Sequence, residues 1–163
     1  MKEYTCCFTG HRTLPKGKLS DISACLEDTI IKYINKGYKY FGTGGALGFD
    51  TLAAETVLKL KIKYPYIKLI LVLPCFAQTK RWNKSDIDRY NHIKTQADKI
   101  VYISKEYTSD CMFKRNRHLV NHSSLCICYL SKNSGGTAYT VNYAKKNNLK
   151  IENIAANLEM SIH

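Results

Sequence analysis

The sequence lacks the long apolar segments that membrane proteins need. None of its 163 residues lies in a stretch that approaches the ~20 apolar residues of a transmembrane helix. The first residues, Met-Lys-Glu-Tyr, lack the apolar region of a secretory signal peptide. The chain also has no internal repeat, low-complexity segment or linker. We therefore expect a cytoplasmic protein without membrane association, in which residues 1–163 form a single domain.

The sequence contains no Cys-x-x-Cys pair, although it has seven cysteines. Several lie next to each other or alternate within apolar runs: Cys6, Cys7, Cys126 and Cys128. An odd number of cysteines inside expected strands predicts free, buried thiols in a reducing compartment. His118 and His122 are four residues apart, but "HLVNH" lacks the glutamate of the metalloprotease helix and an evident third ligand. We expect no bound metal.

Acidic residues are few, with 13 Asp and Glu against 25 Lys and Arg, which gives a net charge of +12. A basic surface attracts polyanions, so nucleic acid is one candidate partner. The lysines are spread over many segments rather than gathered in one stripe, which is more typical of solvated helix ends. Nucleic-acid binding is therefore an alternative and not the favoured function.

Apolar residues recur with strand and helix periods in alternation along the chain. Strands are expected at residues 4–9, 38–43, 67–74, 99–104, 125–130 and 150–154. Helices are expected at 22–34, 47–64, 84–97, 111–123 and 135–148, the first capped by Ser20 or Asp21 and stopped by Gly37. Such alternation implies right-handed crossovers and a mostly parallel sheet covered on both faces. The predicted fold is α/β, a Rossmann-like three-layer sandwich.

Glycine-rich or basic loops follow three of the expected strands. They are Gly10-His11-Arg12, the run from Gly42 to Gly45, and "SKNSGGT" with Gly135 and Gly136. In open parallel sheets, ligands bind beyond the carboxyl ends of the strands. Glycine lets a backbone approach a ligand closely, and a helix N-terminus offers free N–H groups to a phosphate. These loops together indicate a phosphate-bearing ligand, with ordinary tight turns as the alternative.

Three longer stretches carry a family resemblance: "FTGHR", "GALGFDTLAAE" and "FKRNRHLVNHSSLCICYLSKNSGGTAYTVNYA". Together they resemble the YpsA-like branch of the SLOG superfamily, which includes the Rossmann domain of DprA and the LOG phosphoribohydrolases. The resemblance implies a nucleotide or ADP-ribose-type ligand, no required cofactor, and the strand order 4-3-2-1-5-6. It is compatible with a homodimer, which no sequence feature requires. In that strand order the three loops would surround one crevice.

The predicted ligand-binding residues come from these loops, from the start of the helix expected at 47–64 and from the arginine-rich "KRNR" segment: Thr9, Gly10, His11, Arg12, Gly42, Thr43, Gly44, Gly45, Asp50, Arg115, Arg117, Ser134, Gly135, Gly136 and Thr137. Guanidinium groups can clamp a phosphate in bidentate geometry, although exposed helix arginines are also common. Asp50 can bind a ribose hydroxyl or interact favourably with the start of its helix.

Whether the protein is an enzyme stays open at the sequence level. The LOG loop continues into a catalytic glutamate, but here Val141 and Asn142 occupy its expected place, and neither can act as a carboxylate. Asp50 is a weak substitute, and Glu55 lies about 140° away around the same helix. The favoured function is nucleotide binding as a sensor or regulatory protein. The alternatives are a nucleotide N-glycosidic hydrolase or transferase and a DprA-like nucleic-acid-binding module.

Overall fold

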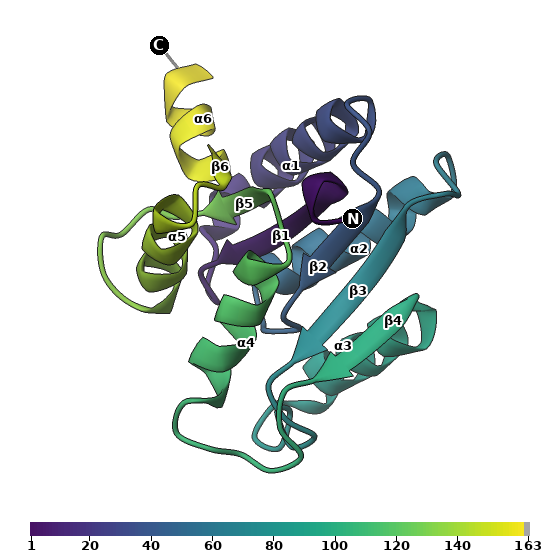
Figure 1. Cartoon of the computed structure of the whole chain (residues 1–163), viewed down its shortest axis with the longest axis vertical. Coiled ribbons are helices and arrows are strands. Elements are labelled where there is room, and N and C mark those ends of the chain that lie inside the picture. The colour runs from purple at the N-terminus through teal and green to yellow at the C-terminus, as the bar shows by residue number, and fades with distance from the viewer. Residues whose placement is uncertain (162–163) are drawn as a thin grey trace.

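The computed structural model describes residues 1–161, which contain a sheet of six parallel strands (Figure 1). The strands are β1 (Thr5–Gly10), β2 (Tyr40–Thr43), β3 (Lys68–Leu73), β4 (Lys99–Tyr102), β5 (Leu125–Tyr129) and β6 (Lys150–Asn153). Their order is β4-β3-β2-β1-β5-β6, and every neighbouring pair is parallel. The predicted α/β class and strand order are confirmed, which places the strand carrying "CCFTGHR" at the centre of the sheet.

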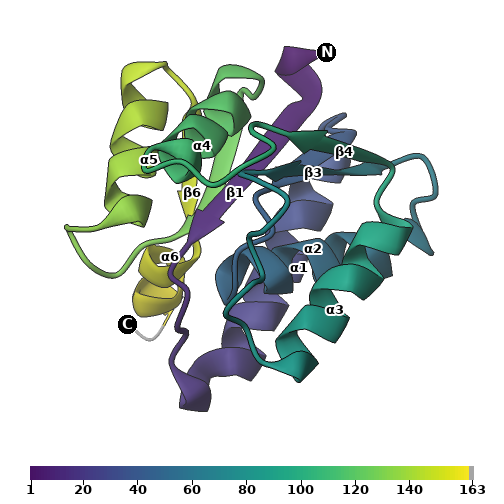
Figure 2. The same ribbon diagram turned by 90° about the horizontal axis from the view of Figure 1, so that it is seen from below.

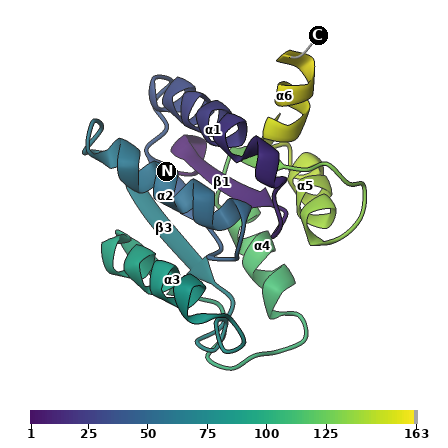
Figure 3. The same ribbon diagram turned by 180° about the vertical axis from the view of Figure 1, so that it is seen from behind.

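Helices cover both faces of this sheet, as Figures 2 and 3 show. The helices are α1 (Leu19–Ile34), α2 (Phe49–Lys61), α3 (Lys84–Gln96), α4 (Cys111–Asn121), α5 (Gly136–Lys146) and α6 (Ile154–Ser161), with short 3₁₀ helices at Lys2–Tyr4 and Lys16–Lys18. One face carries α4 and α5, and the other carries α1, α2, α3 and α6. The three-layer sandwich is therefore present. Within residues 1–161, no helix is long and apolar enough to cross a lipid bilayer.

The two central strands are apolar because both of their faces are covered. Residues 6–9 of β1 and all five residues of β5 are buried. Phe8 packs against Phe41 of β2 and Phe49 of α2, with ring centroids 6.2 and 6.4 Å apart. All seven thiols are free and six are buried, while Cys25 is partly exposed. This core holds the carboxyl ends of β1 and β5 in fixed positions.

The start of α1 differs from the sequence expectation. The prediction that Ser20 or Asp21 caps the helix is wrong, because α1 begins at Leu19 with Lys18 at the N-cap and no side-chain capping bond. The 3₁₀ helix at Lys16–Lys18 runs directly into α1, so the chain already turns before Ser20.

The last helix, α6, was not predicted. Its sequence signal is Asn153, whose side-chain oxygen accepts a hydrogen bond from the Ala155 amide at 3.1 Å. Asparagine is among the preferred capping residues at the start of a helix. The same side chain bonds both backbone groups of Leu130, which fixes the chain just beyond β5.

Candidate functional site

A cavity of about 630 Å³ opens at the carboxyl ends of β1 and β5. This is the point where the strand order reverses, and ligands of open α/β sheets bind at such points. Its walls are the end of β1 and the loop that follows, the start of α2, one face of α4, and the segment leading into α5. Predicted ligand-binding residues that line it are Thr9, Gly10, His11, Arg12, Asp50, Arg115, Ser134, Gly135, Gly136 and Thr137.

Arg115 of α4 forms the deepest cationic part of the cavity wall, and only 5% of its surface is exposed. Its Nη1 donates a hydrogen bond to the Gly44 carbonyl, and its Nε donates to Asn116 Oδ1 at 2.7 Å. A Cβ at Gly44 would overlap the guanidinium, so glycine is required there for Arg115 to occupy this position. Burial lowers the pKa of Arg115, but arginine remains charged at neutral pH.

Asp50, in the first turn of α2, is the carboxylate among the residues that line the cavity. It is 6% exposed, and its Oδ2 accepts a hydrogen bond from the Ala46 amide at 3.3 Å. Burial raises the pKa of Asp50 to about 6, and the nearby positive charge of Arg115 limits that rise. A buried carboxyl that titrates near neutral pH can accept hydrogen bonds from hydroxyl groups or exchange protons with a ligand.

His11 ties the first loop to two other walls of the cavity. Its Nε2 accepts a hydrogen bond from the Ser131 amide at 3.0 Å, and its carbonyl accepts one from the Phe49 amide at 3.1 Å. The first bond requires an unprotonated Nε2, which places the ring proton on Nδ1. Burial and the positive charge of Lys132 lower the pKa of His11, so the neutral ring is favoured.

The start of α5 presents backbone N–H groups beside these cations. Gly135, at the N-cap, has φ = 93°, a conformation that favours glycine. Gly136 has no such constraint, and a Cβ added there would meet no atom within 4 Å. The protein's own packing therefore does not require glycine at position 136. The open space in front of Gly136 is available to a ligand at the positive end of the helix.

The structure does not bring all predicted residues to the cavity. None of Gly42, Thr43, Gly44 and Gly45 lines the cavity. Gly42 and Thr43 lie in β2, Gly44 lies against the Arg115 guanidinium, and Gly45 lies next to Leu73 and Tyr90. Arg117 also lies outside it, and its Nη1 donates to the Tyr139 hydroxyl at 3.4 Å. Residues two apart on a helix point about 200° from each other, so Arg115 and Arg117 face different surroundings.

Sequence reasoning missed several residues of the lining: Thr13, Ala46, Met112, Asn116 and Lys132. Helical spacing was the available signal on α4, because residues 112, 115 and 116 share one face. Lys132 lies just after the end of β5, on the same edge as the predicted loops. The side chains of Lys132 and Arg12 have no hydrogen-bond or ion-pair partner within residues 1–161. Two unpaired cations therefore face the cavity in addition to buried Arg115.

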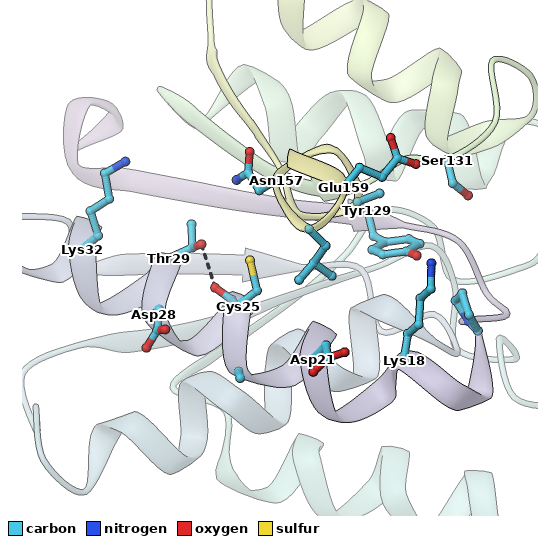
Figure 4. A pocket seen from close by; sticks show the side chains of 14 residues that line it. Lys18, Asp21, Cys25, Asp28, Thr29, Lys32, Tyr129, Ser131, Asn157 and Glu159 are labelled. Atoms are coloured by element: carbon cyan, nitrogen blue, oxygen red, sulfur yellow. Dashed lines mark hydrogen bonds between the residues drawn. The ribbon is translucent and has the colours of Figure 1, made fainter. Parts of the chain in front are cut away.

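A second cavity, of about 720 Å³, lies between α1, α6 and the end of β5 (Figure 4). Asp21, Asp28 and Glu159 line it together with Lys18 and Lys32, so its charges are mixed. Its lining within residues 1–161 contains no glycine, and the first turns of α1 and α6 contribute Asp21 and Ala155 to it. Although this cavity is larger, the first one has the chemistry of an anion site.

The chain is similar in sequence to several curated bacterial proteins. An uncharacterized SPbeta prophage-derived protein of Bacillus subtilis, YoqJ, is 34% identical over 142 residues, which cover 79% of this chain and 81% of the relative. A UPF0398 protein of Halalkalibacterium halodurans is 31% identical, with coverage of 77% and 68%. A UPF0398 protein of Brevibacillus brevis is 29% identical, with coverage of 78% and 70%.

Solved structures share the fold at low sequence identity. The DNA processing protein A (DprA) of Helicobacter pylori matches with a TM-score of 0.67 and 17% identity, over 98% of this chain and 73% of that one. DprA of Streptococcus pneumoniae matches with a TM-score of 0.66 and 16% identity, over 92% of this chain and half of that one.

The model of the YpsA family, described as the YspA SLOG family, matches residues 7–160. The matched residues include the last four residues of β1, all of β2 to β6 and every wall of the cavity, and the chain belongs to this SLOG family.

Proposed function

We propose that the cavity binds a nucleotide or a nucleotide-derived ligand, such as an ADP-ribose-type molecule, through its phosphate. The observation that carries this proposal is the charge of the lining. Arg12, Arg115 and Lys132 face the same space as the start of α5, while Asp50 is the carboxylate among the lining residues. Charge-assisted hydrogen bonds from such groups are the usual way in which proteins hold phosphate.

The size and polarity of the cavity suit a nucleotide better than a free phosphate ion. Its volume of about 630 Å³ falls within the range of roughly 300–1,000 Å³ that is typical of small-molecule sites. Buried Asp50 is positioned to accept hydrogen bonds from sugar hydroxyls, next to the cations that would hold the phosphate. The ligand would therefore have both an anionic group and a hydroxylated group, and the protein would act as a sensor or regulatory protein.

A thermal-shift screen with nucleotides, dinucleotides, cyclic nucleotides and ribose 5-phosphate tests the proposal. A ligand at about 100 times its Kd stabilises a fold by roughly 2.7 kcal/mol, which is a measurable shift in Tm. We expect saturable stabilisation by at least one nucleotide, with no change in the nucleotide during incubation. If no nucleotide stabilises the protein at millimolar concentration, the proposal is wrong.

The buried carboxylate of Asp50 in the cavity lining supports a second candidate function, cleavage of a nucleotide N-glycosidic bond. Such a reaction needs a carboxylate that stabilises positive charge on the sugar or activates water. Val141 is buried in α5 and Asn142 carries no charge, so Asp50 is the acid in place for this chemistry. Release of ribose 5-phosphate from a nucleoside monophosphate, lost in Asp50→Asn, would establish the enzyme. Binding of the nucleotide without release of ribose 5-phosphate would support the sensor or regulatory function instead.

The protein should lose stability as Asp50 ionises. Its pKa in the fold is about 6, above the ordinary value near 4, so the folded state binds this proton more tightly than the unfolded state does. The contribution of Asp50 to the free energy of unfolding should fall by about 1.4 kcal/mol per pH unit from pH 4 to pH 6, and then level off. Denaturant unfolding of wild type and Asp50→Asn at several pH values measures this. A stability difference between the two that is independent of pH would contradict it.

A further inference from the structure

Two large aromatic side chains are exposed on the turns of α4 and α5 that also contribute residues to the cavity lining. Phe113 of α4 is 42% exposed and Tyr139 of α5 is 39% exposed. Their ring centroids lie 4.9 Å apart, and the ring planes meet at 75°. Arg117 holds the pair from one side through its hydrogen bond to the Tyr139 hydroxyl. The two rings therefore form a corner that is partly exposed to solvent.

Both rings come from the helix turns that also form the cavity wall. Phe113 follows Met112, which lines the cavity, and Tyr139 follows Gly136 and Thr137, which line it from α5. The amide of Tyr139 donates to the Gly135 carbonyl at 3.0 Å, which fixes this turn. A helix rises about 1.5 Å per residue, so the backbone at position 139 lies about 4.5 Å along the axis of α5 from Gly136.

We propose that Phe113 and Tyr139 form a subsite on which the base of the ligand stacks. The inference rests on the proposed function, because it assumes that the phosphate lies at the start of α5. A planar base can stack on one ring of the corner while its edge meets the other ring. Stacking on aromatic rings is a common and sequence-tolerant way to hold a base.

The chemistry around the corner fits a base better than an aliphatic group. Arg117 places a cation at the corner, and guanidinium planes also stack on bases and donate to their ring nitrogens and carbonyl oxygens. The subsite gives a role to Arg117, the arginine of the "KRNR" segment that does not line the cavity. Arg115 would contact the anionic part of the ligand from inside, and Arg117 would support the base from outside.

Isothermal titration with AMP, GMP and ribose 5-phosphate tests the subsite, since ribose 5-phosphate has no base. In Phe113→Leu and Tyr139→Leu, which keep apolar packing between α4 and α5, the affinity for AMP and GMP should fall about 5- to 150-fold. The affinity for ribose 5-phosphate should not change. The control Tyr66→Leu removes an exposed tyrosine ring just before the amino end of β3, away from the corner, and should bind AMP within about threefold of wild type.

A second measurement does not depend on affinity. In Trp82→Phe with Phe113→Trp, the indole at position 113 is the sole tryptophan. AMP should quench its fluorescence and ribose 5-phosphate should not, because only the base stacks on the ring. If AMP and ribose 5-phosphate bind wild type equally tightly, or if both leucine variants bind AMP normally, the subsite is wrong while the phosphate site stands. If no nucleotide of the thermal-shift screen binds wild type, the proposed function itself fails.

Discussion

Gly136→Asp is expected to lower the affinity for a phosphate-bearing ligand more than 100-fold without unfolding the protein. The new carboxylate would enter the open space in front of α5, where we place the phosphate, and like charges repel strongly in a partly enclosed site. An acidic residue in the first turn of a helix interacts favourably with the helix dipole, so Tm should be unchanged or slightly higher. Isothermal titration and thermal melting measure the two effects.

Gly136→Asn provides the matched control for this substitution. Asparagine has nearly the same size as aspartate but no charge, so it separates steric exclusion from repulsion. We expect the asparagine variant to retain substantially more binding than Gly136→Asp. If Gly136→Asp binds nucleotide as tightly as wild type, the phosphate is held elsewhere in the protein.

Gly48→Ala should destabilise the fold by about 4 kcal/mol or more. Gly48 precedes α2 with φ = 78°, and a Cβ there would overlap the carbonyl groups of His11 and Arg12. Alanine at such a φ is strained, and here the backbone of the β1 loop would also have to move. Because that loop forms one wall of the cavity, the variant should also lose ligand binding.

Gly17→Ala is the control for the stability measurement. A Cβ at Gly17 meets no atom within 4 Å, and its backbone does not require glycine. Urea unfolding should give Gly17→Ala a free energy of unfolding within about 0.5 kcal/mol of wild type. A Gly48→Ala protein as stable as wild type would mean that the loop after β1 is not packed against α2 as described.

The order of elements could be predicted from sequence because the apolar periods are long and regular. The runs in β1 and β5 are continuous, as expected for strands buried on both faces. The strand order came from the family resemblance, since periodicity carries no information about which strands are neighbours. The start of α1 and the short α6 were missed because a 3₁₀ turn and a lone asparagine cap leave weak signals.

The sequence predicted the loops that line the candidate site and two of its helix residues, Asp50 and Arg115, but not how the helices turn their side chains. Gly10, Gly135 and Gly136 could be placed at strand ends from the pattern alone. The separation of Arg115 from Arg117 depends on the rotation of α4 about its axis, which the local sequence does not determine. Gly44 is a further example, because its requirement for glycine comes from a guanidinium 71 residues away in the sequence.

The central claim is that specific cations at one sheet edge hold the phosphate. Arg12 is exposed and unpaired at the end of β1, whereas Lys145 and Lys146 lie exposed in the last turn of α5, at the opposite end from Gly136. Loss of a charge-assisted phosphate contact should weaken binding by roughly 1.5–3 kcal/mol. Arg12→Ala therefore removes a predicted contact with little expected effect on the fold, and the two lysine variants are controls of equal charge change.

The most direct measurement is the Tm shift produced by the best nucleotide of the screen in wild type, Arg12→Ala, Arg115→Ala, Lys145→Ala and Lys146→Ala. In wild type, a ligand at about 100 times its Kd should raise Tm by about 5–11 °C. We predict that Arg12→Ala and Arg115→Ala each reduce this shift by more than half, and that both lysine variants retain it. If all four substitutions reduce the shift equally, the binding is diffuse electrostatic attraction to a basic protein, which would contradict the phosphate site and favour nucleic-acid binding.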